Sequence, residues 1–226
     1  ETLKTELTDA GNPSLALESL ARMQGFDTSA SHTAYADAYN SLMILRIIKN
    51  KHKDNWETFL KTSTKASVET LLKREGIYSI FENVKGRNMM YLACTLHPNH
   101  CFHERYESWG YLWDCRRNPE PFLDLSVNQL RDTLKNFSPK ALRVLKTNKG
   151  PIVLDKEFAL KQKPYSDLEL STILKRAKMV RENEKFCKNI QTINREIADE
   201  KEQTKSQEDI VQEETLYEKF IPNKDT

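Results

Sequence analysis

The stretch IYSIFENVKGRNMMYLACTL, residues 77–96, decides the predicted fold class, because it is the first part of the chain with a strand-like composition. Aromatic and β-branched residues favour strands, and here they are interrupted by a glycine. We expect strands over 77–84 and 88–96. The same composition continues to residue 125 and predicts strands over 106–115 and 121–125. Residues 142–147 and 151–155 are interpreted as a strand pair, or as a strand and a loop.

Helical patterns flank this β-rich part on both sides. Apolar residues recur at helical spacing in 14–24 and 33–49, and a short helix is expected over 66–74. Capping boxes predict helices that begin at Asp54, Ser126 and Ser166. The remaining expectations are a charged helix over 186–210, a mobile linker over 198–214 and a last docked piece over 216–222. The chain is therefore predicted to be an α+β protein.

Charge is unevenly distributed along the 226 residues, although the formal net charge is only +2. Residues 46–74 carry eight Lys and Arg against three acids, residues 135–163 carry eight against two, and residues from 198 onward are mostly acidic. A basic face of this kind is typical of a protein that binds a polyanion, but a solvated lysine-rich surface explains it equally well. Since no apolar run approaches the ~18–20 residues of a membrane helix, no membrane partner is expected.

The cysteines and histidines gather in one segment. Four cysteines in a chain of this length do not make a disulfide framework, so we expect a reducing, cytoplasmic environment. The number of potential ligands in residues 94–115 suggests zinc. Because cysteine and histidine are interleaved and no Cys-x-x-Cys occurs, a β-turn with incidental polar residues is favoured over a metal site. The six residues concerned are Cys94, His97, His100, Cys101, His103 and Cys115.

The β-rich part also holds many aromatic residues. Aromatic side chains on a small sheet beside lysines can form a platform on which nucleic-acid bases stack. They can equally form the core of a small β module, and this interpretation is favoured for any single ring. If residues 106–115 form a strand, Trp109 and Tyr111 lie on one face, opposite Leu112. The other candidates are Tyr78, Phe81, Tyr91, Phe102, Tyr106 and Trp113.

A third candidate is HTAYAD, in which His32, Ala34 and Asp37 have the spacing His-x-Ala-x-x-Asp. Taken singly, a histidine before a helix is typically a capping residue, and an aspartate in the first turn interacts with the helix dipole. Together they suit a two-metal phosphodiesterase, in which a carboxylate holds a metal and the imidazole takes a proton from the attacking water. Such a site needs more acids, and no paired Asp-x-Glu precedes His32 in this sequence.

HTAYAD, followed by AYNSLMILRIIK, resembles the last catalytic motif of the DEDDh 3′→5′ exonucleases, and more narrowly of the bacterial exodeoxyribonucleases I. Other stretches resemble this family in the same order along the chain: NPSLALESLARMQGF, LACTLHPN, LRVLKTNKGPIVL, LKRAKMVREN and LYEKF. The resemblance implies the end of a ribonuclease-H-like α/β exonuclease domain in 1–53. It further implies an SH3-like β-rich module with flanking helices in 54–160 and a helical domain in 161–226. In that register the chain is an internal piece of a longer protein.

The resemblance also implies roles for single residues. His32 would be the general base and Asp37 a ligand of Mg²⁺, two of which fill a complete active site. Lys65, Arg143 and Asn148 fall where the family contacts single-stranded DNA, and cations suit its phosphate backbone. Arg181 falls where the family binds the acidic C-terminal tail of single-stranded DNA-binding protein, and an arginine fork suits a terminal carboxylate. A monomer is implied.

This sequence departs from the family at Thr33, where an aspartate is usual, and at Ala16, where an arginine is usual; the β module is also longer after Pro98.

The sequence leaves three functions open. The first is part of a 3′→5′ exodeoxyribonuclease that releases nucleoside monophosphates from single-stranded DNA in DNA repair and recombination, with the isolated chain inactive. The alternative is a non-catalytic module that binds single-stranded DNA or the protein tail. The third is a zinc-stabilised adaptor built on Cys94 to Cys115.

Overall fold

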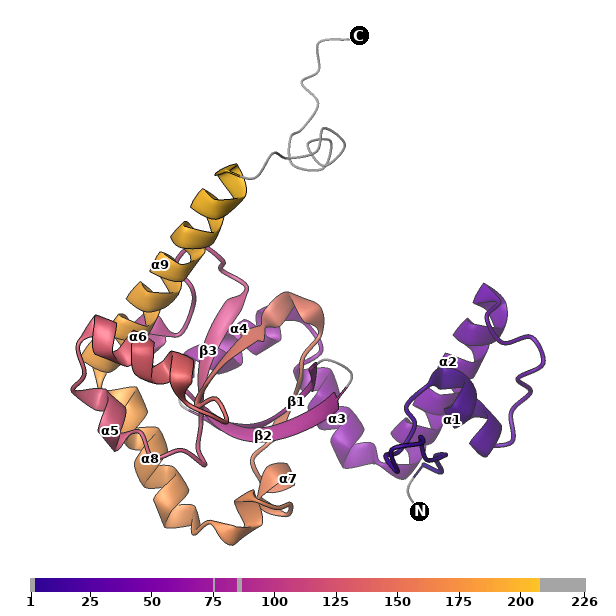
Figure 1. Ribbon diagram of the computed structural model, residues 1–226. Helices are drawn as coiled ribbons and strands as arrows, with labels where there is room; N and C mark the ends of the chain where they lie inside the picture. The colour runs from indigo at the N-terminus through magenta and orange to yellow at the C-terminus, as the bar shows by residue number, and fades with distance from the viewer. Residues whose placement is uncertain (1–2, 75, 85–86, 208–226) are drawn as a thin grey trace. The chain divides into compact units, whose positions relative to one another are not determined.

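The computed structural model describes residues 3–74, 76–84 and 87–207. The chain divides into two compact units, Glu1–Thr62 and Ser63–Thr226. The first unit contains helices, and the second is built on one antiparallel sheet covered by helices (Figure 1). The predicted α+β class is confirmed. The division into 1–53, 54–160 and 161–226 stays a prediction.

The first unit contains helices α1 (Leu17–Met23), α2 (Ala34–Lys51) and α3 (Lys53–Lys61). Helices α1 and α2 pack against each other. The Glu6 carboxylate fixes the segment before α1, because it accepts hydrogen bonds from Ser19 Oγ at 2.8 Å and Arg22 Nε at 2.9 Å. The capping box predicted at Asp54 is wrong, since α3 begins at Lys53. Its N-cap residue, His52, makes no side-chain cap, and Asp54 already lies in the first turn.

The second unit is organised by strands β1 (Ile77–Val84), β2 (Arg87–Thr95), β3 (Trp109–Asp114), β4 (Leu142–Lys146) and β5 (Ile152–Asp155). They form one sheet in the order β4-β3-β2-β1-β5, and every neighbouring pair is antiparallel. The predicted strands 77–84, 88–96 and 106–115 are confirmed with small shifts. Strands β4 and β5 do not pair with each other, because they occupy opposite edges of the sheet.

Helices and short turns surround the sheet (Figure 1). They are α4 (Lys65–Lys73), η1 (Pro98–His100), α5 (Glu120–Leu123), α6 (Val127–Asn136), η2 (Thr147–Lys149), α7 (Glu157–Leu160), η3 (Tyr165–Asp167), α8 (Leu170–Glu182) and α9 (Glu184–Gln207). The capping box at Ser126 is confirmed, with Gln129 as its partner. The strand predicted over 121–125 is wrong, because residues 121–123 lie in α5 and residue 124 is in a turn. A proline in the first turn is compatible with a helix, and Phe122 turns into the core against Trp113.

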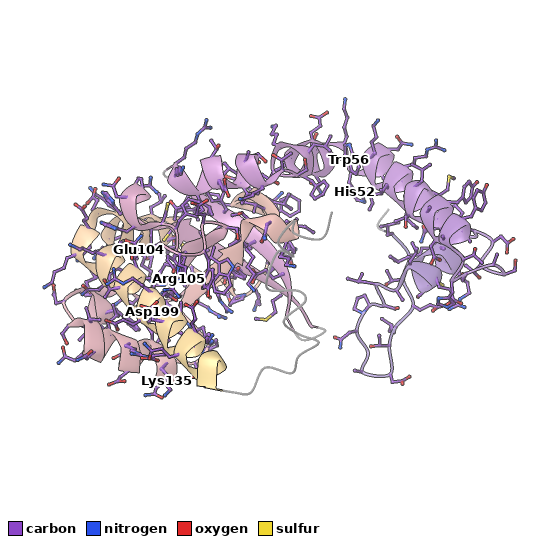
Figure 2. All side chains as sticks on the ribbon, turned by 90° about the horizontal axis from the view of Figure 1, so that it is seen from above. His52, Trp56, Glu104, Arg105, Lys135 and Asp199 are labelled. Atoms are coloured by element: carbon purple, nitrogen blue, oxygen red, sulfur yellow. The ribbon has the colours of Figure 1, made fainter. Side chains whose placement is uncertain are left out.

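Two further predictions fail because tertiary contacts decide the local structure. Ser166 lies in η3, and α8 begins only at Leu170, because the neighbouring Tyr165 is buried and its hydroxyl donates to Asp114 Oδ1 at 3.0 Å. Residues 198–207 belong to α9 rather than to a linker. Arg105 pairs with Asp199 at 2.6 Å, and Figure 2 labels both, beside Glu104. Residues 208–214 of the predicted linker and the predicted piece 216–222 lie outside the described residues.

The core of the second unit explains most of the aromatic residues. Trp113 is fully buried, with its ring centroid 5.1 Å from Phe122 and 5.6 Å from Phe186 of α9. Tyr91 and Tyr111 are also buried, so these three rings are core residues rather than a stacking platform. At the adjacent position, Gly110, a Cβ would lie 2.3 Å from a methyl group of Leu72 in α4, so the Leu72 side chain would have to shift to accommodate any other residue.

Among the described residues, no helix combines the length and the apolar character that a bilayer crossing requires.

Candidate functional site

The predicted catalytic pair lies at the start of α2. Thr33 is the N-cap of this helix, and its hydroxyl accepts a hydrogen bond from Ala36 N–H at 3.3 Å. His32 stands just before the cap with φ +72°, in the left-handed region that a non-glycine residue rarely adopts. The His32 backbone N–H donates to Asp37 Oδ1 at 3.3 Å. Within the motif, this hydrogen bond thus connects His32 in the loop to Asp37 in the first turn of α2.

The His32 imidazole points to a different acid. Its side chain is 86% exposed, and Nε2 lies 3.6 Å from Glu18 Oε2 of α1. The site therefore comprises an exposed imidazole beside the Glu18 carboxylate of α1, while the Asp37 carboxylate of α2 accepts from the backbone N–H of the same histidine. The two helices pack against each other. The sequence motifs did not single out Glu18, because it does not belong to a paired Asp-x-Glu. The signal that could have found it is its place in the NPSLALESLARMQGF stretch, which resembles the helix before the catalytic histidine in the family.

Carboxylate oxygens are the ligands that Mg²⁺ prefers, so the donor types of Asp37 and Glu18 fit this ion. In the described part of the chain, however, Glu18, His32 and Asp37 are not among the groups whose ligand atoms all lie within 4.8 Å of one another. A two-metal site bridging a phosphate needs more acids than these two residues supply. The described residues can therefore contribute a part of such a site.

The predicted DNA-contacting residues lie on three elements of the second unit. Lys65 opens α4, is half exposed and has its Nζ 3.5 Å from Glu69 Oε1. Glu69 Oε1 also accepts a hydrogen bond from Thr147 Oγ1 at 3.2 Å, which ties α4 to turn η2. Asn148 is exposed in that same turn. The structure thus brings the elements that carry Lys65 and Asn148 together.

Arg143 lies within the sheet on β4, opposite Leu112 of β3. Its guanidinium stands over the Tyr91 ring, 5.0 Å from the centroid. Burial raises the pKa of the Glu82 carboxyl, while the Tyr91 hydroxyl and the Arg143 charge lower it. Arg143 therefore belongs to a partly buried cluster on the sheet. A role for Lys65, Arg143 and Asn148 in binding DNA stays a prediction.

Sequence reasoning missed a second basic position at the end of β4. Lys146 Nζ stands 4.5 Å from the centroid of Trp109, which lies opposite it in the register of β3 and β4. The Tyr106 ring is 4.6 Å from Trp109, and Tyr106 is 38% exposed. A cation on a partly exposed aromatic pair is the combination that binds single-stranded nucleic acids. The lysines and aromatic residues in the sequence pointed to this region, but only the strand register shows which lysine meets which ring.

Arg181 is held at the end of α8 by backbone oxygens. Its Nη1 donates to the carbonyl oxygens of Arg74 at 2.9 Å and Leu96 at 3.3 Å, and also bonds the Thr95 hydroxyl; Nη2 donates to Lys73 O at 3.3 Å. Arg181 also lines a pocket of about 350 Å³. Other lining residues are Tyr78, Thr95, Asp155, Lys156 and Lys178. The guanidinium is therefore rigidly placed at the wall of a mixed-charge pocket.

The four cysteines lie in the hydrophobic core, and the turn η1 forms at Pro98–His100. All four are free and buried. Burial raises the pKa of Cys101 to about 11 and that of Cys187 to about 12, and a hydrogen bond with Cys94 together with burial raises the pKa of Cys115 well above its ordinary value. Because they are buried among apolar neighbours, these residues act as core side chains. Where the structure is described, the ligand atoms that meet instead belong to His97, His100 and Glu184.

Comparison with known proteins shows the fold. No protein-family model and no curated protein sequence matches the chain. Solved structures of exonuclease I do match. The complex of ExoI with SSB-Ct has a TM-score of 0.63 at 18% identity, covering 85% of this chain and 43% of that one. E. coli exonuclease I with a dT13 oligonucleotide gives 0.63 at 19% identity, with 85% and 43% covered. Exonuclease I from Methylocaldum szegediense gives 0.63 at 17% identity, with the same coverage.

The chain thus has an exonuclease I-like fold and spans less than half of the length of the structures it matches. The resemblance predicted from the ordered motifs is confirmed at the level of the fold.

Proposed function

We propose that this chain is part of an exodeoxyribonuclease I-like enzyme that hydrolyses single-stranded DNA from its 3′ end. One observation carries the proposal. In a chain with an exonuclease I-like fold, the His-x-Ala-x-x-Asp motif exposes the imidazole of His32, and the backbone N–H of His32 donates to the Asp37 carboxylate. The finer architecture that accompanies it, with a ribonuclease-H-like end, an SH3-like module and a helical domain, is part of the same proposal.

In the proposed reaction His32 is the general base. Its ring is 86% exposed, so that an attacking water can reach it, and its Nε2 lies 3.6 Å from Glu18 Oε2. Asp37 and Glu18 offer carboxylate oxygens for Mg²⁺, which when bound would polarise the phosphate and activate the attacking water. Asp37 also holds the backbone of His32, so that the base is positioned by the same side chain that would bind the metal.

The test replaces Asp37 by alanine in the longer protein that this proposal implies. Exonuclease activity on a 5′-labelled oligonucleotide with Mg²⁺ is expected to be lost, because both the metal ligand and the tether of His32 disappear. Asp9→Ala, another exposed acid of the same unit, is the matched control and is expected to retain the wild-type rate. A wild-type rate in Asp37→Ala refutes the role of Asp37. The 226-residue chain alone is expected to be inactive, and Mg²⁺-dependent nucleotide release by it would contradict the incomplete site.

A second candidate function is binding of single-stranded DNA without catalysis, favoured by the contact of Lys146 with Trp109 at the sheet edge. Lys65, Arg143 and Asn148 are proposed to contact the same ligand. Replacing Lys65 or Lys146 by alanine is expected to weaken binding to an oligo-dT and to reduce the salt slope by about 0.7 for each phosphate that is no longer neutralised. Replacing the exposed Lys188 of α9 serves as control. Equal weakening in all three variants would show only a general charge effect.

The proposed protein partner is the acidic C-terminal tail of single-stranded DNA-binding protein, with Arg181 as its anchor. The exonuclease I structure in complex with SSB-Ct supports this partner. Arg181→Ala is expected to abolish binding of a labelled acidic peptide in fluorescence anisotropy. Arg176 is a matched control, because it also lies on α8 and bonds backbone oxygens, of Cys115 and Arg116, but does not line the pocket. If both variants bind equally weakly, Arg181 acts only by holding α8.

A further inference from the structure

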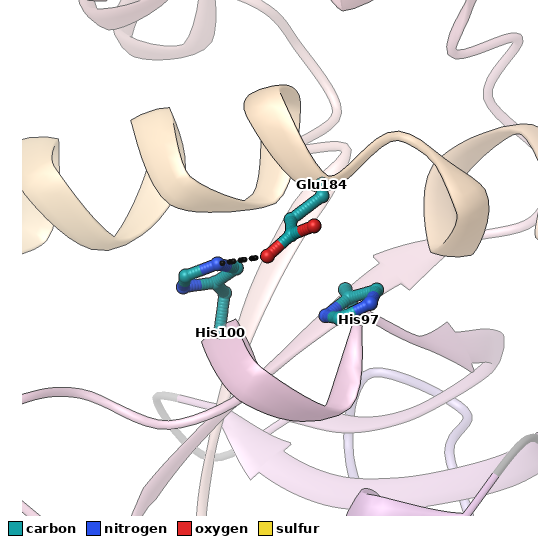
Figure 3. Close-up of side chains that lie close together, drawn as sticks. All are labelled: His97, His100 and Glu184. Atoms are coloured by element: carbon teal, nitrogen blue, oxygen red, sulfur yellow. Dashed lines mark hydrogen bonds and ion pairs between the residues drawn. The ribbon is translucent and has the colours of Figure 1, made fainter.

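Three potential metal ligands meet where the turn after β2 contacts the start of α9 (Figure 3). His97 and His100 stand at the two ends of turn η1, and Glu184 is the first residue of α9. Their ligand atoms all lie within 4.8 Å of one another. We propose that His97, His100 and Glu184 form a site for a zinc ion, with water as the fourth ligand.

The His100 ring is already oriented as a ligand. Its Nδ1 lies 2.9 Å from Gln191 Oε1, and the Gln191 amide nitrogen donates to the Phe102 carbonyl oxygen at 3.0 Å. That second bond fixes which end of the amide is oxygen, so Nδ1 of His100 must carry the hydrogen. The lone pair of Nε2 is then free for a metal or a proton. An outer partner that fixes the tautomer in this way is typical of metal-binding histidines.

The geometry of the His100–Glu184 pair fits zinc. Nε2 of His100 lies 3.3 Å from Glu184 Oε1 (Figure 3). Two ligands at bond lengths of about 2.0–2.1 Å in a tetrahedron are separated by about 3.3–3.4 Å. The pair therefore spans one edge of a tetrahedral site without moving. The His100 side chain is only 15% exposed, so its neighbours restrict the movement of the ring.

His97 completes the site by a small movement. Its Nδ1 accepts a hydrogen bond from the Asn99 backbone N–H at 3.3 Å, which is long for an N–H···N contact. The two imidazole centroids are 5.8 Å apart and the rings are tilted by 34°, and the ligand atoms of both rings and of Glu184 lie within 4.8 Å of one another. Binding would exchange the weak Asn99 contact for a metal bond. Three protein ligands leave one position for water, as in zinc sites that are not fully enclosed.

The ligand types select the ion. Imidazole nitrogen suits zinc and its neighbours in the transition series, whereas Mg²⁺ prefers oxygen ligands throughout. The four cysteines are buried in the hydrophobic core, and among the described residues none of them belongs to the group of ligand atoms that meet here. Glu184 lies 84 residues after His100, so a bound ion would link β2 to α9 and stabilise the packing of that helix in the second unit.

The experiment measures zinc binding to the whole 226-residue chain. The wild type, Glu184→Gln, the double variant His97→Gln/His100→Gln and the control His52→Gln, which removes an imidazole of the first unit, are incubated with ZnCl₂, desalted and analysed for metal. Thermal unfolding is followed with and without ZnCl₂, and with MgCl₂ as a second control. Replacing zinc by Co²⁺ then reports the coordination geometry through its visible absorption.

We expect one zinc per wild-type chain and a rise in Tm of about 5–10 °C at a hundredfold excess over Kd, with no rise in MgCl₂. Glu184→Gln and the double variant should lose the bound zinc and the Tm rise, whereas His52→Gln keeps both. Because Glu184 is 60% exposed, Glu184→Gln is expected to fold, and circular dichroism checks this. The proposal is overturned if the wild type binds no zinc, if the ligand variants bind as much as the wild type, or if the cobalt spectrum shows thiolate charge transfer.

Discussion

The surroundings of His32 and of His100 hold an imidazole in opposite ways. His32 is 86% exposed, its backbone is in the left-handed region, and its Nε2 lies 3.6 Å from a carboxylate oxygen of Glu18. His100 is 15% exposed, and both of its ring nitrogens face side chains of α9. An exposed ring can reach a substrate and exchange protons with water, whereas a ring fixed on both sides suits a stationary ligand. The difference assigns a candidate base to the first unit and a candidate metal ligand to the second.

The largest expected effect is on stability, and it comes from a substitution in the core of the second unit, which contains His100. Trp113→Ala deletes a fully buried ring between Phe122 and Phe186, and we expect a decrease of about 3–5 kcal/mol in the free energy of unfolding of the second unit. Urea denaturation followed by circular dichroism measures it. Tyr35→Ala on α2 is the control, since its side chain is 82% exposed and the change should stay within about 0.5 kcal/mol. Similar decreases in the free energy of unfolding of both variants would mean that burial does not distinguish Trp113 from Tyr35.

A sharper test of the fixed imidazole is Gln191→Ala. Without Gln191 the tautomer and the orientation of His100 are no longer set, so zinc affinity should fall about 10–100-fold. Asn189→Ala is the matched control, because Asn189 is another amide of α9 that bonds a backbone oxygen, that of Leu125, away from the site. Competitive titration with a zinc-sensitive dye measures both. Unchanged affinity in Gln191→Ala would show that His100 needs no support.

The contrast between the two sites also shows what the sequence can predict. The strands β1, β2 and β3 were predictable because their aromatic and β-branched residues favour a pleated surface locally. The segment 121–125 was also expected to be a strand, but residues 121–123 lie in α5, because Phe122 packs on Trp113, a contact that no local pattern encodes. The N-terminus of α8 was misplaced for a related reason, since the buried Tyr165–Asp114 hydrogen bond takes the preceding turn into the core.

The candidate sites divide in the same way. His32 and Asp37 could be identified because their contact spans five residues and is closed by one helix turn. Glu184 and Gln191 could not, because both reach His100 from a separate helix that lies more than 80 residues away in the sequence. Cysteines drew attention to the segment 94–115 by their number, yet the ligand atoms that meet there come from histidine and from a glutamate outside the segment.

A smaller effect is expected at the helix cap that places His32. Thr33→Ala removes the hydroxyl that accepts from Ala36 N–H and donates to the Ala30 carbonyl oxygen at 2.8 Å. The first unit should be destabilised by about 1 kcal/mol. Thr33→Asp, which places a cap acceptor and the residue usual in the resembling family there, should retain stability. Thermal unfolding by circular dichroism compares them, and equal stability of all three proteins would show that the cap does not hold the loop of His32.

The smallest effect is expected from the dependence of stability on pH. It comes from a third histidine, His103, which is buried, unlike the exposed His32 and the candidate ligand His100. His103 is 3% exposed. Its Nε2 lies 3.2 Å from the Asn194 carbonyl oxygen and must carry the hydrogen, while Nδ1 accepts from the backbone N–H groups of Arg105 at 3.0 Å and Tyr106 at 3.3 Å. A second proton on Nδ1 would face two donors.

Burial accordingly lowers the pKa of His103. The unfolded chain, with a histidine pKa of about 6.5, therefore binds this proton more readily than the folded chain does. The contribution of His103 to stability is fully present above about pH 6.5 and is lost as the pH falls toward the lowered folded pKa. When the pH is changed from about 8 to about 5.5, the urea midpoint should decrease for the wild type, and decrease less for His103→Gln, which has no titrating ring. If the urea midpoint decreases equally in both proteins, the pH sensitivity comes from other groups. Burial would then not distinguish His103 from His32 and His100.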